Sequence, residues 1–242
     1  MTQEITFSSP IFDLIDQPTP SLLKIPKTYK DMPNFNGSSK FFESTVKKCI
    51  PFLDALTIGY IITIPVDYVV QISEEIKNDK KETKFDLKYS DEIPDTFNEF
   101  MGISSHFSYQ VPKELRNEHR TVNAILKFSN PWTIKTPPGY SCIFTQPFNR
   151  NLPYKIIDGV VDTDQYTLPI NFPFYWTQDL SIKECLIPKG TPMALVIPFK
   201  RDNWKMKIEK QEHEDKFKSK IKFGAYFIDK YKRLFWKKKS FK

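Results

Sequence analysis

Cysteine and glycine are scarce in this sequence, and long hydrophobic runs are missing. The three cysteines, Cys49, Cys142 and Cys185, are an odd number at wide spacing. They predict neither a disulfide framework nor a zinc site, and they favour free thiols in a reducing compartment. No stretch is apolar for long enough to form a transmembrane segment. Because the N-terminus also lacks the basic region and apolar run of a signal peptide, we expect a cytoplasmic protein that is not secreted.

Proline, in contrast, is abundant. The chain has 19 prolines against 7 glycines, and aromatic residues make up 15% of it. This hydrophobic content is too high for a disordered chain. The prolines disfavour long helices and favour short strands joined by rigid turns. The composition therefore predicts a folded, mostly β protein.

Three regions follow from the spacing of these residues. Residues 1–40 form a Pro-rich extended arm, residues 41–204 a single β domain, and residues 205–242 a basic tail. The arm would lie across the domain or reach a neighbouring subunit; the alternative is a poorly ordered terminus. Its apolar anchors would be Ile11, Phe12, Leu14 and Ile15.

Short runs of β-branched and aromatic residues predict the strands of the central domain. Residues 66–90 look like a hairpin, because Phe85, Leu87 and Tyr89 alternate with polar residues. Pro138-Gly139 predicts a tight turn in which the glycine has a positive φ. Strands this short, joined by frequent turns, predict a sandwich or barrel. The expected strands are 60–72, 85–89, 122–132 with a break at Asn130-Pro131 and a continuation over 132–135, 140–145, 156–161, 167–176 and 193–199.

An aromatic-rich set accompanies these strands. Its members could line a ligand pocket or stack on bases, but such sets more often form a core or a subunit interface. The set comprises Tyr140, Phe144, Phe148, Phe172, Phe174, Tyr175 and Trp176.

Positive charge is concentrated in the tail. Residues 205–242 hold 14 Lys/Arg and 5 Asp/Glu, so the tail carries +9 and the rest of the chain −2, within a total of +7. Apolar residues recur at helical spacing from Phe217 to Phe235 and predict a basic amphipathic helix. It would bind nucleic acid, an anionic membrane surface or an acidic protein, or it would dock on its own domain with its lysines in water. The binding candidates are Lys216, Lys220, Lys230, Lys232, Arg233, Trp236, Lys237, Lys238 and Lys239.

Three segments between residues 121 and 200 carry a family resemblance. They are Ile134-Lys135-Thr136-Pro137-Pro138-Gly139-Tyr140, Gly159-Val160-Val161-Asp162-Thr163-Asp164, and the Pro188-Lys189-Gly190 turn with the apolar strand that follows it. In order and spacing they resemble the dUTPase and dCTP deaminase superfamily. The resemblance implies a β-clip fold, a distorted barrel of short strands that often assembles as a trimer.

The resemblance also implies roles for individual residues. Asp162 matches the carboxylate that activates water, with Mg²⁺ shielding the phosphates. Asp164 lies two residues further along, so both carboxylates share one face of a strand. They form a catalytic or metal pair, or their side chains bond nearby backbone amides in a turn. The ligand-binding candidates of the matching region are Tyr140, Gln146, Arg150 and Tyr166.

The chain departs from the family where phosphate is bound. The family's Pro-Arg-Ser-Gly loop is replaced by Thr145-Gln146-Pro147-Phe148, and the position of its sugar-stacking tyrosine is taken by Gln165, with Tyr166 one residue late. A slip of one residue turns a strand side chain to the other face. Elsewhere, His106 and His119 are 13 residues apart with no helical relation, so they predict no metal pair.

The leading hypothesis is therefore a non-catalytic β-clip protein that acts as a binding or assembly module and needs no cofactor. One alternative is a Mg²⁺-dependent nucleotide hydrolase or deaminase relative that uses Asp162. Another is a nucleic-acid-binding protein that uses its basic tail. The whole chain also resembles an uncharacterised family of tailed phages and bacteria, which implies a location in the host cytoplasm or in a virion.

Overall fold

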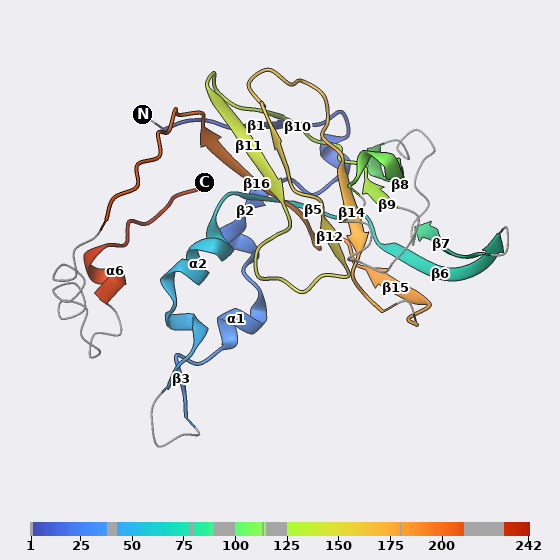
Figure 1. The fold of residues 1–242 in the computed structure, drawn as a ribbon, viewed down its shortest axis with the longest axis horizontal. Helices are drawn as coiled ribbons and strands as arrows, with labels where there is room; N and C mark the ends of the chain where they lie inside the picture. The colour runs from blue at the N-terminus through green and yellow to red at the C-terminus, as the bar shows by residue number, and fades with distance from the viewer. Residues whose placement is uncertain are drawn as a thin grey trace.

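The computed structural model describes residues 2–37, 43–77, 80–89, 100–112, 114, 125–179, 181–210 and 230–242. It is mostly β, as the sequence predicts. Strand pairing among these residues is antiparallel throughout. Figure 1 shows the sheets gathered in the centre, with short helices at one side. No described helix has the length and apolar character needed to cross a membrane.

The largest sheet has five strands in the order β13-β11-β16-β5-β2. Its strands are β13 (Gly159–Val161), β11 (Tyr140–Thr145), β16 (Pro192–Lys200), β5 (Tyr60–Thr63) and β2 (Thr19–Pro20). The sheet places together strands from segments of the chain that are far apart in sequence.

A four-stranded sheet, β12-β14-β9-β8, and a three-stranded sheet, β15-β6-β7, complete most of the β structure. β6 and β7 form the hairpin that the alternating residues predict, with Lys77 opposite Lys80. Its turn residues, Asn78 and Asp79, lie outside the described residues. The strands are β12 (Tyr154–Ile156), β14 (Phe172–Trp176), β9 (Ile125–Phe128), β8 (Ile103–His106), β15 (Glu184–Ile187), β6 (Tyr68–Lys77) and β7 (Lys80–Tyr89).

The remaining elements are short. β1 pairs with β10, and β3 pairs with β4. These strands are β1 (Thr6–Ser8), β10 (Thr133–Lys135), β3 (Phe35–Asn36) and β4 (Glu43–Ser44). The α-helices are α1 (Lys27–Asp31), α2 (Ile50–Thr57) and α6 (Lys230–Leu234). Single 3₁₀ turns occupy Phe12–Leu14, Ser21–Lys24, Val46–Lys48 and Ser108–Gln110.

The prediction of a barrel is wrong for the described strands, which form open sheets and do not close on themselves. The five-stranded sheet ends at β13 on one side and at β2 on the other. β2 contains Pro20, which has no backbone N–H to donate to a further strand. The sequence shows many short strands, but only the pairing of their edges decides between a barrel and open sheets.

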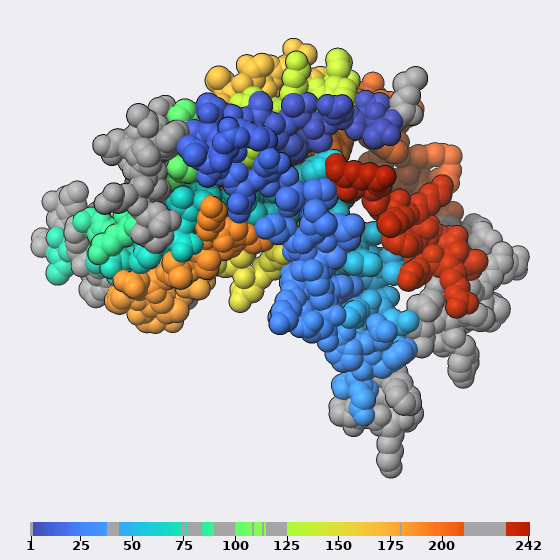
Figure 2. Space-filling model, turned by 180° about the vertical axis from the view of Figure 1, so that it is seen from behind, coloured from blue at the N-terminus to red at the C-terminus, as the bar shows by residue number. Residues whose placement is uncertain are grey.

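The N-terminal segment packs on the strands. β1 pairs with β10 and β2 pairs with β5, while Ile11 and Ile15 are buried in the core. Phe12 and Leu14, the other two expected anchors, are exposed. Figure 2 shows this segment in dark blue, running across the surface of the molecule.

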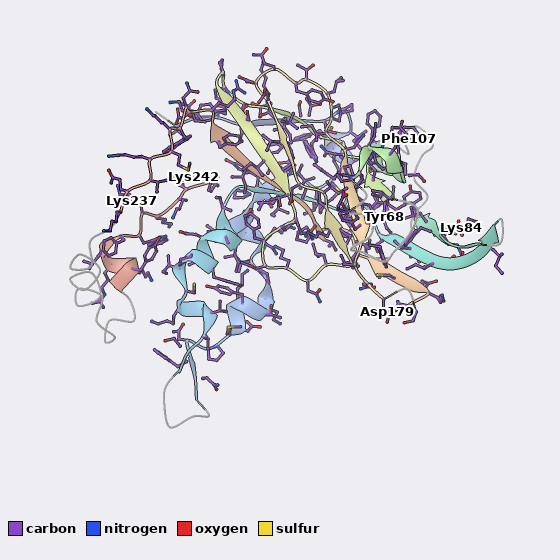
Figure 3. The ribbon with its side chains drawn as sticks, in the orientation of Figure 1. Tyr68, Lys84, Phe107, Asp179, Lys237 and Lys242 are labelled. Carbon is purple, nitrogen blue, oxygen red and sulfur yellow. The ribbon has the colours of Figure 1, made fainter. Side chains whose placement is uncertain are left out.

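The core combines aliphatic residues with a group of aromatic residues from the four-stranded sheet and its neighbours. Phe128 lies at its centre, with its ring 4.0 Å from that of Phe174 and 4.8 Å from that of Tyr154. Tyr68 joins the same group and donates its hydroxyl hydrogen to the Met101 carbonyl; Figure 3 shows Tyr68 inside the molecule, with Phe107 at the periphery. Within the aromatic-rich set, Phe144, Phe172, Phe174, Tyr175 and Trp176 are buried and Phe148 is exposed.

The predicted basic amphipathic helix is not confirmed, because most of the periodic stretch from Phe217 to Phe235 lies outside the described residues. Residues 203–210 and 236–242 are not helical, and α6 covers only Lys230–Leu234. The intervening residues 211–229, with candidates Lys216 and Lys220, lie outside the described residues. At the C-terminal end, Trp236 contacts α2 through Asp54, and the Lys242 carbonyl accepts the hydroxyl of Tyr60 on β5.

Candidate functional site

Asp162 and Asp164 lie in the turn that follows β13. The backbone N–H groups of Gln165 and Tyr166 donate to the Asp162 carbonyl at 3.0 and 2.9 Å, which closes the turn. Thr163, between the two carboxylates, is buried. The two aspartates therefore occupy a turn at the end of the strand, near the first residues of β11.

Asp164 is enclosed and fully bonded. Its side chain is only 2% exposed. One carboxylate oxygen accepts the backbone N–H of Gly139 at 2.8 Å, and Arg201 donates to both oxygens in a bidentate pair, from Nη1 at 2.9 Å and from Nη2. Gly139 has φ +84°, as the Pro-Gly turn predicts. The hydrogen bonds from Arg201 and Gly139 lower the pKa of Asp164 to about 2.

Asp162 is more exposed but shares the same arginine. Its Oδ1 accepts the Ser141 hydroxyl at 2.6 Å and lies 3.2 Å from Arg201 Nη1. That nitrogen also donates to the Tyr140 carbonyl at 2.9 Å. We call Gly139, Ser141, Asp162, Asp164 and Arg201 the carboxylate cluster. It ties the start of β11, the turn after β13 and the end of β16 to one another.

Buried hydroxyls and a thiol lie behind the cluster. The Thr136 and Thr163 hydroxyl oxygens are 2.7 Å apart, and Thr163 donates to Cys142 Sγ at 3.3 Å. Burial raises the pKa of the Cys142 thiol to about 11, although the hydrogen bond from Thr163 opposes the shift. Cys142 is therefore protonated and enclosed at neutral pH, which makes it a poor nucleophile.

Arg201 is the functional residue that the sequence analysis missed. It directly follows β16, and its backbone N–H donates to the Gly139 carbonyl at 2.9 Å. In the sequence it is one of many basic residues. Only the antiparallel register, with Lys200 opposite Tyr140, brings its guanidinium to the carboxylates.

The ligand-binding candidates do not converge on the carboxylate cluster. Tyr140 begins β11 beside the cluster, whereas Gln146 and Arg150 follow its other end, Thr145. Six residues of strand span about 17–20 Å. Tyr166 is exposed and lies in the turn beside Asp162. The sequence places these residues in one candidate pocket, and the structure divides them between the two ends of a strand.

Gln146 and Arg150 both hold the loop that follows β11. Gln146 Oε1 accepts the Ile156 N–H at 2.9 Å, and Arg150 Nη1 donates to the Lys24 carbonyl at 2.6 Å. Burial lowers the pKa of Arg150. Between this loop and Lys155 lies an open hollow of about 520 Å³. Both polar groups are used within the protein, where the resembling family has its phosphate-binding loop.

The C-terminal segment, residues 235–242, docks on α2. Trp236 Nε1 donates to both carboxylate oxygens of Asp54 at 3.0 and 3.1 Å, and Lys239 Nζ binds the same carboxylate at 2.5 Å. The ring of Phe241 packs edge-on against Tyr60. A cavity of about 230 Å³ remains between this segment and α2. Two of the predicted tail contacts, Trp236 and Lys239, thus serve the protein's own fold.

The other basic candidates of the described tail lie at the surface. Lys232, Arg233, Lys237 and Lys238 are exposed, and Figure 3 shows Lys237 on the outside of the molecule. Lys230 begins α6. Across the described residues, no three His, Cys, Asp or Glu side chains are grouped to hold a metal ion.

Comparisons with protein-family models, with curated proteins and with solved structures find no match for this chain.

The low pKa of Asp164 predicts how acid affects stability. An aspartate in the unfolded chain titrates near pH 3.9, above the folded value of about 2. The stabilisation is therefore present above about pH 4 and is lost as the pH falls toward 2. We expect urea unfolding to show a steeper loss of stability over this range in the wild type than in Asp164→Asn. The exposed Asp13→Asn is the control; equal slopes for wild type and Asp164→Asn would contradict the prediction.

Proposed function

We propose that this protein is a non-catalytic β module that binds or assembles with other protein. The observation that supports the proposal is the carboxylate cluster, in which Arg201 binds both Asp162 and Asp164. A catalytic base needs a free lone pair within reach of a substrate or water proton. Asp164 is enclosed, and its low pKa makes it a weak base at neutral pH.

The bonding of Asp162 also favours a structural role. Its Oδ1 is shared between the Ser141 hydroxyl and Arg201. These contacts join the turn to the start of β11 and to the end of β16. The loop candidates Gln146 and Arg150 are likewise bonded to backbone groups of the protein itself.

The proposal includes a distant relationship to the dUTPase-like superfamily. Of the segments that carry the resemblance, the first ends where β11 begins, the second contains β13 and the third leads into β16. These three strands are neighbours in one sheet. The chain keeps these strands, but Asp162, Asp164 and Gln146 form hydrogen bonds within the protein. This arrangement supports a module that has lost the ability to bind and hydrolyse nucleotides. The separate resemblance of the whole chain to an uncharacterised family of tailed phages and bacteria implies a setting in a phage or its bacterial host.

A nucleotide screen tests the proposal. Deoxynucleoside triphosphates and monophosphates are added one at a time, with and without Mg²⁺, and the melting temperature and phosphate or pyrophosphate release are measured. We expect no concentration-dependent rise in melting temperature and no turnover, because a ligand of the folded state would stabilise it.

Asp162→Asn is the matched variant for this screen. We expect it to resemble the wild type in every condition. A nucleotide that raises the melting temperature of the wild type, is turned over, and loses both effects in Asp162→Asn would contradict the proposal and favour a hydrolase or deaminase.

A further inference from the structure

The chain beyond β16 carries a row of exposed large apolar side chains. Trp204, Met206 and Ile208 are 90%, 83% and 84% exposed. Figure 1 shows this stretch in orange, leading away from the sheets. A single exposed apolar residue is ordinary, but three in a row, including a tryptophan, mark a contact surface.

The spacing of these residues is that of a strand. Trp204, Met206 and Ile208 alternate with Lys205, Lys207 and Glu209. In an extended chain, this period of two places the apolar residues on one face and the charged residues on the other. Residues 203–210 belong to none of the sheets formed by the described residues. The stretch has the pattern of a strand but has no partner strand in the described part of the chain.

The edge of the five-stranded sheet offers a matching surface. β13 is the terminal strand of this sheet, and its Val160 is 64% exposed. Val160 lies opposite Ile143, which lies opposite Ile197 on the other side. These three side chains share one face and are all at least partly exposed. Tyr166, in the turn after β13, and Leu168, two residues further on, are also exposed.

The charges of the two surfaces are opposite. The β13 edge and the turn that follows it hold Asp158, Asp162 and Asp164; the last two share Arg201, so this edge carries a net charge of −2. Residues 203–210 contain three lysines and one glutamate. Opposite charges favour the encounter of the basic strand with the acidic edge. Repulsion between like charges disfavours pairing between two copies of residues 203–210.

Trp204 cannot reach the β13 edge of its own chain. A strand added beside β13 lies three strand spacings from β16, about 14 Å. Arg201 is fixed by the carboxylate cluster. From Arg201 to Trp204 the chain has three steps of at most about 3.8 Å each. This reach is too short for Trp204 to pack beside β13 of its own chain, so a contact that includes Trp204 belongs to another molecule.

We propose that residues 203–210 of one molecule add as a strand to the outer edge of β13 in a second copy of this chain. Trp204, Met206 and Ile208 pack against the surface formed by Val160, Tyr166 and Leu168. Strand addition gives the backbone polar groups of both segments a partner and covers an open sheet edge. This inference rests on the proposed function, because it names the partner of the assembly module.

The native mass of the full chain is the first test. Light scattering on a size-exclusion column is expected to give a multiple of the 28.5 kDa monomer. Trp204→Glu combined with Ile208→Glu is expected to give the monomer with an unchanged melting temperature of the β domain. Ile76→Glu, which charges an equally exposed apolar residue on β6, is the control and is expected to keep the assembly.

Cross-linking between two different variants tests the contact directly. In a background with Cys49→Ser and Cys185→Ser, one protein carries Val160→Cys and the other carries Met206→Cys. Oxidation is expected to yield a disulfide-linked dimer from the mixture, and much less from either protein alone.

Two outcomes would overturn the inference. In the first, the wild type remains monomeric at every concentration. In the second, the variant with Trp204→Glu and Ile208→Glu still assembles, and the mixture of Val160→Cys and Met206→Cys proteins gives no cross-link. Either result leaves a module that binds a different protein. Nucleotide turnover would instead overturn the proposed function without changing the native mass.

Discussion

Phe128→Ala is expected to lower the free energy of unfolding by about 3–5 kcal/mol, the range for removing a buried aromatic ring. Phe128 has no exposed surface, and its ring contacts Phe174, Tyr154 and Tyr68. The contacts come from β14, β12 and β6, so the cavity would weaken two sheets together. Chemical unfolding followed by fluorescence and by circular dichroism measures the change.

Phe107→Ala is the matched control for this prediction. Phe107 is 65% exposed and stacks only on Tyr109 among the described rings. An exposed substitution is expected to change stability by no more than about 0.5 kcal/mol. Similar losses for Phe107→Ala and Phe128→Ala would show that the aromatic group around Phe128 is not the centre of the core.

Gly59→Ala is expected to cause the second large loss, for a different reason. Gly59 has φ +70°, which costs an alanine about 1–2 kcal/mol. An added Cβ would also lie 2.2 Å from the Val196 carbonyl oxygen, so β5 and β16 would have to separate. Such overpacking costs about 1–3 kcal/mol. The total of about 2–5 kcal/mol is measured by chemical unfolding.

Two other glycines separate these contributions. Gly139 has φ +84° with no atom near an added Cβ, so Gly139→Ala carries only the conformational cost. Gly159 has neither a positive φ nor a close neighbour, and Gly159→Ala is expected to be nearly neutral. If Gly59→Ala is no worse than Gly139→Ala, the close approach of β5 and β16 is not a constraint on the fold.

The strands were largely predictable, because their signal is local. β11 coincides with the expected strand over 140–145, and β6 and β7 form the expected hairpin. Expected strand 60–72 is two strands, β5 and β6, separated around Pro65. A proline cannot donate to a ladder, but whether it ends a strand or sits at an edge depends on the neighbouring strand.

The candidate site was only partly predictable. The two aspartates and the Gly139 turn stand out in the sequence, but their partner Arg201 comes from the end of a strand 37 residues beyond Asp164. The grouping of Tyr140 with Gln146 and Arg150 relied on the family resemblance. The strand between them keeps them apart, since an extended chain adds about 3.4 Å with every residue.

The tail shows the same division between local and tertiary information. Its helical spacing predicts one basic amphipathic helix, but residues 211–229, which carry most of that spacing, lie outside the described residues. In the described part, Trp236 and Lys239 bind Asp54 on α2. These contacts join residues far apart in the chain, so the local spacing did not predict them.

By itself, the sequence determined the β class, the position of most strands, the positive φ at Gly139 and the concentration of basic charge near the C-terminus. These depend on alternation, turn chemistry and composition, which act over a few residues. The tertiary structure decided that the sheets stay open, that Arg201 joins both aspartates and that the C-terminal segment docks on α2. Each of these depends on contacts between residues far apart in the chain, which no local pattern specifies.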